Sequence, residues 1–78
     1  MKNHTGDKNM KKLISKAIYA YINTGAQHFF CNGVEIKKDK DCSFICSKGR
    51  KVNTYIPKEN DTVKTVANAL AKIIEEIQ

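Results

Sequence analysis

Several features that define whole classes of protein are missing from this sequence. It has no tryptophan, one proline and three cysteines in 78 residues. No stretch approaches the roughly 18 uninterrupted apolar residues of a membrane span. An odd number of cysteines leaves at least one thiol unpaired, which favours a reducing compartment over a secreted disulfide framework. These absences predict a cytoplasmic protein that does not associate with membranes.

The beginning of the chain also lacks the pattern of a secretory signal. The apolar run that follows Lys11-Lys12 is interrupted at Lys16, and no small-residue cleavage site follows it. Residues 1–9 are polar and include a glycine, which predicts a flexible N-terminal arm. We expect a single small domain over residues 10–78, because a chain of this length has room for one core only.

The sequence does contain many apolar residues and an excess of positive charge. Hydrophobic residues make up 41% of the chain, which is enough for a folded core. Lysine and arginine number 14 against 8 acidic residues, for a net charge of +6, and this excess permits an anionic partner. Residues 1–16 and 34–51 are net positive, whereas residues 58–78 are net negative. The C-terminal segment is therefore not expected to contribute to a basic surface.

Two segments have the periodicity of amphipathic helices. From residue 9 to residue 23, apolar residues recur at one-residue and three-residue spacings, and Gly25 is placed to end this helix. The second helix follows Pro57 and is capped by Asn60 or Asp61. Its apolar residues lie within an arc of about 120°, and they are Val63, Val66, Ala67, Leu70, Ile73, Ile74 and Ile77.

Between the helices, three runs have strand character: His28–Lys37, Cys42–Ser47 and Lys51–Ile56. Short polar connections predict antiparallel neighbours. Asn32-Gly33, inside the first run, is either a tight turn or a bulge. The order predicts an α+β fold, helix–three-stranded antiparallel sheet–helix, with both helices on one sheet face because each has only one apolar side.

Four residues have the chemistry of a zinc site: His28, Cys31, Cys42 and Cys46. On a strand, however, Cys42 and Cys46 would lie about 13 Å apart, too far to share an ion. We therefore expect no metal, no cofactor and buried cysteines that act as small hydrophobic residues. His28 and Cys31 would point to opposite faces of a strand, so no catalytic pair is predicted either.

Two basic groups are candidates for contact with nucleic acid. On the first helix, Lys8, Lys12 and Lys16 are four residues apart, and Tyr19 projects from the same stripe. In the last hairpin, the positive residues are Lys48, Arg50 and Lys51. The alternatives are a solvated lysine face and a charged hairpin tip that resists edge aggregation.

An interface is predicted on the sheet face that the helices leave open. Strand alternation gives an inward set of Val34, Ile36, Phe44, Cys46, Val52 and Ile56. Ile45 and Tyr55 then point outward, and Phe29 adds a further apolar side chain. Such a patch predicts contact with a partner protein or with a second copy in a symmetric dimer.

The helix–three strands–helix order resembles that of the double-stranded-RNA-binding domain and of the HicA-type mRNA interferase toxins. The nearest local likeness to HicA is Gly49-Arg50-Lys51-Val52, which leads through Tyr55-Ile56-Pro57 into the last helix. The HicA family has its essential histidine where this chain has Cys42-Ser43-Phe44. The lysine cluster of the RNA-binding family is replaced by Asn60-Asp61-Thr62-Val63-Lys64. The resemblance therefore implies topology, which many functions share.

The sequence thus predicts a small, basic, non-enzymatic module that binds nucleic acid. Two alternatives remain. The first is a phage or mobile-element protein that inhibits a host protein through its open sheet face, since the lysine-, asparagine- and isoleucine-rich usage fits an AT-rich bacterial or phage genome. The second is a HicA-like ribonuclease toxin.

Overall fold

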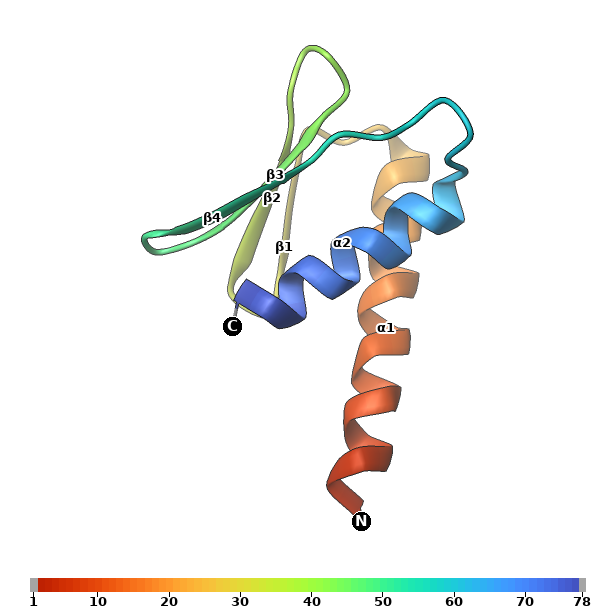
Figure 1. Ribbon diagram of the computed structural model, residues 1–78, viewed down its shortest axis with the longest axis vertical. Helices are drawn as coiled ribbons and strands as arrows, with labels where there is room; N and C mark the ends of the chain where they lie inside the picture. Colours follow the sequence, from red (N-terminus) through yellow and green to blue (C-terminus); the bar gives the residue numbers. More distant parts are fainter. Residues whose placement is uncertain (1, 78) are drawn as a thin grey trace.

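Two helices pack against a four-stranded antiparallel sheet in the computed structural model, which describes the backbone of residues 2–77 and the side chains of residues 11–77 (Figure 1). The elements are α1 (Lys2–Thr24), β1 (His28–Cys31), β2 (Val34–Lys38), β3 (Phe44–Lys48), β4 (Lys51–Tyr55) and α2 (Val63–Ile77). The strands lie in the order β1-β2-β3-β4. The predicted α+β class is confirmed, with four strands in place of three.

The additional strand arises at Asn32-Gly33, which is a tight turn. Asn32 and Gly33 have φ angles of 53° and 79°, and Cys31 pairs with Val34 across the turn. Two consecutive left-handed residues are the requirement of the two-residue type I′ hairpin, and Asn-Gly meets it at low cost. The run predicted as one strand over His28–Lys37 is therefore the β1–β2 hairpin.

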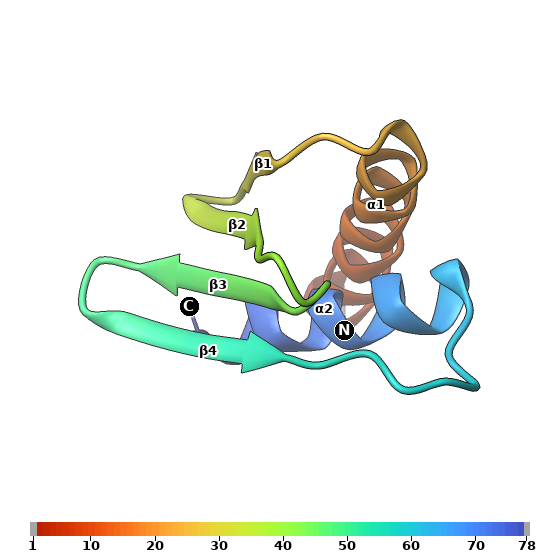
Figure 2. The ribbon, with the colours of Figure 1, turned by 90° about the horizontal axis from the view of Figure 1, so that it is seen from above.

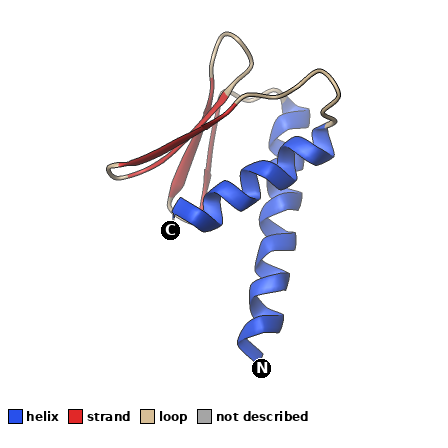
Figure 3. Ribbon diagram, viewed as in Figure 1, coloured by secondary structure: helices blue, strands red, loops and turns tan. Residues whose placement is uncertain are grey.

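Both helices pack on one face of the sheet, as expected (Figures 2 and 3). The inner side chains of β2 and β3 join the helices in one cluster, and its buried members are Ile14, Ile18, Tyr21, Val34, Ile36, Phe44, Cys46, Val66, Ala67, Leu70, Ala71, Ile74 and Ile77. The ring of Tyr21 stacks on Phe29, with ring centroids 5.1 Å apart, and this pair closes the core beside β1.

Helix α1 is longer at its start than the periodicity predicted. It begins at Lys2 and so includes most of residues 1–9, where a flexible arm was expected. Its N-terminal half extends beyond α2 and the sheet (Figure 1). The flexibility of this segment stays a prediction. At the other end, Gly25 has a φ of 75° and donates its amide to the Ile22 carbonyl, which confirms the predicted termination.

The cap of α2 lies one or two residues later than expected. Thr62 accepts a hydrogen bond at its Oγ1 from the Thr65 amide, and the Thr62 amide donates to Thr65 Oγ1. This reciprocal pair has the form of a capping box. Asp61 instead joins the preceding loop to the sheet, because it accepts hydrogen bonds from the Lys58 amide and the Tyr55 hydroxyl. These donors, with Thr65, hold the pKa of Asp61 below its usual range.

The side of β4 that faces the helices is the opposite of the one predicted. Tyr55 pairs with Phe44 on the helix-covered side, whereas Val52 pairs with Ser47 on the open side and is 63% exposed. Ile56, also expected inside, is 67% exposed. The prediction for Val52 and Ile56 is therefore wrong. The first four residues of β4 are exposed on either face, so only Tyr55 has a core to pack against.

Candidate nucleic-acid interface

An open groove of about 1430 Å³ lies between α1 and α2. We call it the basic groove, and its lining residues are Lys11, Lys12, Leu13, Ser15, Lys16, Tyr19, Lys64, Asn68, Ala69 and Lys72. Five of these residues are lysines, and none of the described residues that line the groove is acidic. Its electrostatic character is therefore positive, although the net charge of α2 itself gives no sign of this.

The α1 wall contains most of the predicted helix candidates. Lys12, Lys16 and Tyr19 are all exposed and all line the groove, so the structure brings these three together. Helical geometry explains the arrangement, because side chains four residues apart lie one above the other on the same face. Lys8 belongs to α1, but its side chain lies outside the described residues.

The α2 wall corrects one expectation from the sequence. Lys64, Asn68 and Lys72 recur at every fourth position and line the groove, although the C-terminal segment was expected to lie outside the basic surface. They occupy the side of α2 opposite its buried residues. The period of four was visible in the sequence. The net charge of residues 58–78 concealed it, because that sum also includes acidic residues that do not line the groove.

A hydrogen bond links the two walls. Ser15 Oγ donates to Asn68 Oδ1 at 2.6 Å, and these residues are 53 positions apart in the chain. Helices α1 and α2 also share the core through Ile14, Ile18 and Leu70. The relative position of the two lysine rows is therefore set by packing below the groove and by a polar contact within it.

The hairpin candidates lie elsewhere. Lys48, Arg50 and Lys51 are exposed at the β3–β4 turn, where Lys48 pairs with Lys51 across Gly49-Arg50. In two perpendicular views this turn lies at the far side of the molecule from α1 (Figures 1 and 2). The structure therefore separates the six predicted nucleic-acid residues whose side chains it describes into two groups that do not form one surface.

The predicted interface residues are also divided between two faces. Ile45 lies on the open face, beside Thr54 of β4, as expected. Phe29 and Tyr55 pack against the core from the helix side, so the predicted outward direction of Tyr55 is wrong. Phe30 pairs with Glu35 on the open face and is 68% exposed, so it provides an aromatic ring on that face.

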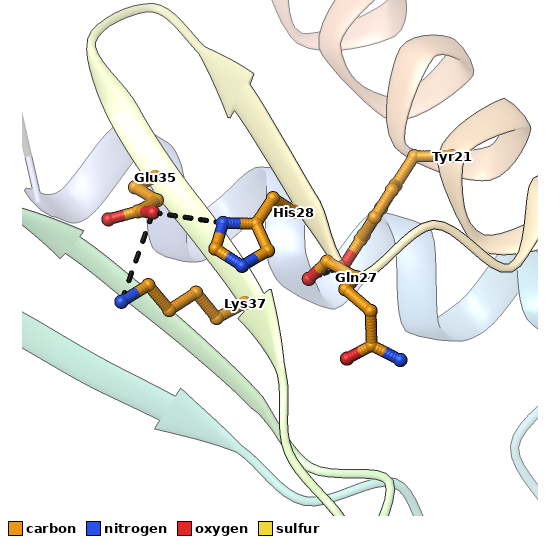
Figure 4. A network of polar contacts seen from close by, with 5 residues as sticks. All are labelled: Tyr21, Gln27, His28, Glu35 and Lys37. Carbon is orange, nitrogen blue, oxygen red and sulfur yellow. Dashed lines mark hydrogen bonds and ion pairs between the residues drawn. The ribbon is translucent and has the colours of Figure 1, made fainter.

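A small polar network lies across the β1–β2 hairpin (Figure 4). Glu35 Oε2 is 3.3 Å from His28 Nδ1 and 4.0 Å from Lys37 Nζ, and all three side chains lie on the open face. Tyr21, on the other side of β1, donates its hydroxyl to the Gln27 carbonyl at 3.3 Å. The open face therefore holds both signs of charge beside apolar side chains.

The cysteines do not converge. Cys46 is buried, Cys31 is half-buried and Cys42 is exposed in the β2–β3 loop, and all three are free thiols. Burial raises the pKa of the Cys46 thiol to about 11, so it stays protonated at neutral pH. Within the described part of the chain, no group of three or more His, Cys, Asp or Glu side chains has the geometry to hold a metal ion.

No protein-family model, curated protein or solved structure matches this chain. The resemblance to double-stranded-RNA-binding and HicA-type domains therefore stays a prediction. In the portion that the structure describes, neither helix combines the length and the apolar character needed to cross a bilayer. The class that the fold and the groove define is a small α+β domain with a lysine-lined cleft between its two helices.

Proposed function

We propose that this protein is a non-enzymatic module that binds nucleic acid in the basic groove. One observation carries the proposal: five lysines from two helices line a single groove, and no acidic side chain among the described residues lines it with them. Lysines placed along a groove neutralise successive phosphates and release their counterions. If the lysines were only solvated surface residues, there would be no reason for lysines from two segments about 50 residues apart in the chain to line the same groove.

Salt dependence tests this proposal. If four or five lysines contact phosphates, the slope of log affinity against log salt concentration should be about −3 for a single strand. The measurement is fluorescence anisotropy of a labelled 12-nucleotide DNA or RNA at several salt concentrations. No detectable binding to any DNA or RNA at low salt would overturn the proposal.

A non-enzymatic role is supported by where the acid–base groups lie. His28 does not line the basic groove, and its partner Glu35 lies with it on the open sheet face. A strand held by the groove lysines is therefore not placed against this pair. In the same binding assay the labelled RNA should stay intact, and its rapid cleavage would favour the ribonuclease alternative.

Protein–protein contact through the open sheet face is the second candidate function. Among the residues whose side chains the structure describes, five large hydrophobic residues are exposed, and three of them lie on this face or directly after β4: Phe30, Val52 and Ile56. We assign a second copy of the chain as the occupant. Because Glu35 lies beside Lys37, a two-fold axis that passes between these residues would bring Glu35 of one copy against Lys37 of the other.

Light scattering at micromolar concentration tests this assignment. We expect a mass of about twice 8.8 kDa, and Val52→Lys should return the protein to the mass of one chain, because it places a charge in the apolar contact. Asn53→Lys, on the opposite face of the same strand, should leave the dimer intact. A wild-type mass of 8.8 kDa would contradict the second copy and favour a host protein as the partner, as in the inhibitor alternative.

A further inference from the structure

The basic groove has an apolar component that phosphate binding alone does not require. Leu13 and Tyr19 line it, and they are 65% and 45% exposed. Among the exposed large hydrophobic residues that the structure describes, they are the two that do not belong to the region of the open sheet face. An exposed aromatic ring among lysines is the combination with which proteins bind unpaired bases, because every base has a face that stacks.

Lysines from both walls line the groove together with this ring. Lys12 and Lys16 are one helical turn apart, with a rise of about 6 Å between them, and both line the groove with Tyr19. Across the groove, Lys64 and Lys72 are separated by a rise of about 12 Å along α2. A strand that follows the groove therefore has cations on both sides and an aromatic ring on the α1 wall.

A duplex uses such a groove poorly. Its bases are already paired and stacked, so its outer surface offers phosphates and groove edges and has no free base face for Tyr19. Tyr19 lies in the last two turns of α1, between the buried Ile18 and Tyr21, whereas the N-terminal half of this helix extends away from the rest of the domain (Figure 1). The ring therefore belongs to the cleft where the two helices pack together.

We propose that the basic groove is specific for single-stranded nucleic acid, with phosphates held by the two lysine rows and a base stacked on Tyr19. This inference rests on the proposed function. It adds the class of ligand and assigns Tyr19 the role of a stacking platform, while the lysines supply the sequence-independent affinity.

The test compares a labelled 12-nucleotide single strand with the duplex of the same sequence. The single strand should bind more tightly, and Tyr19→Ala should weaken its binding by about 5- to 150-fold, the range of one lost stacking contact. Tyr19→Phe, which keeps the ring, should bind like the wild type. Circular dichroism verifies that both variants fold, as expected for a side chain outside the buried core.

The other outcomes separate the two proposals. Equal or tighter binding of the duplex, or a single-strand affinity that Tyr19→Ala leaves unchanged, would overturn the single-strand inference and leave the nucleic-acid function standing. Absence of binding to both probes would overturn the function itself. Poly-L-glutamate serves as an anionic control, and its binding as tightly as the single strand would contradict both, since it would assign the groove to an acidic polypeptide.

Discussion

Reversing the charge of one lysine on each wall of the basic groove should nearly abolish nucleic-acid binding. Lys16 and Lys72 lie on different helices and both line the groove. Losing two phosphate contacts should weaken the binding of a single strand by about 50-fold at about 50 mM salt. The double variant Lys16→Glu with Lys72→Glu should lose more affinity than this, because each new carboxylate also repels phosphate. The salt slope should also become shallower by about 1.4, from two contacts at about 0.7 each.

The β3–β4 hairpin provides a matched control. Lys48→Glu with Lys51→Glu changes the net charge of the protein by the same amount, at residues that lie outside the groove. If binding depends on the groove, this variant should lose much less affinity, and its salt slope should stay near that of the wild type. An equal loss for both double variants would assign binding to the overall charge and exclude a defined groove.

The second large effect concerns the leucine at the centre of the helix layer. Leu70 is fully buried among residues of both helices and the sheet, so Leu70→Ala should reduce the free energy of unfolding by about 2–5 kcal/mol. For a domain of this size the total is roughly 4–12 kcal/mol. A loss in this range should lower the melting temperature by about 10 °C or more.

Leu13→Ala is the control for that experiment. It removes the same atoms from a leucine that is 65% exposed in the basic groove, so its effect on unfolding should stay within about 0.5 kcal/mol. Urea and thermal unfolding, followed by circular dichroism, measure both variants. Equal losses would mean that α2 does not pack as described.

Local chemistry predicted the features that depend on neighbours in the chain. Seven apolar residues with helical periodicity predicted α2, and five of them are buried: Val66, Ala67, Leu70, Ile74 and Ile77. Gly25 ends α1 because its left-handed conformation suits a helix terminus. For Asn32-Gly33, the sequence offered a turn or a bulge, and only the pairing of Cys31 with Val34 decided between them.

Strand alternation could not predict which face of β4 lies toward the helices. Alternation states which residues share a face but not which face is covered. Its more apolar set, with Val52, points away from the helices, because the hairpin extends past them and burial has little influence there (Figure 1). Tyr55 sets the direction instead, through its packing beside Phe44 and its hydrogen bond to Asp61.

The basic groove shows the same division between local and tertiary information. By itself, the sequence determined the two lysine stripes, since a period of four places residues on one side of any helix. Only the tertiary structure decided that Lys12 and Lys16 share a groove with Lys64 and Lys72, and that the hairpin lysines do not. The physical reason is that the buried faces of α1 and α2 determine how the helices pack, and the exposed lysines take the positions that this packing leaves them.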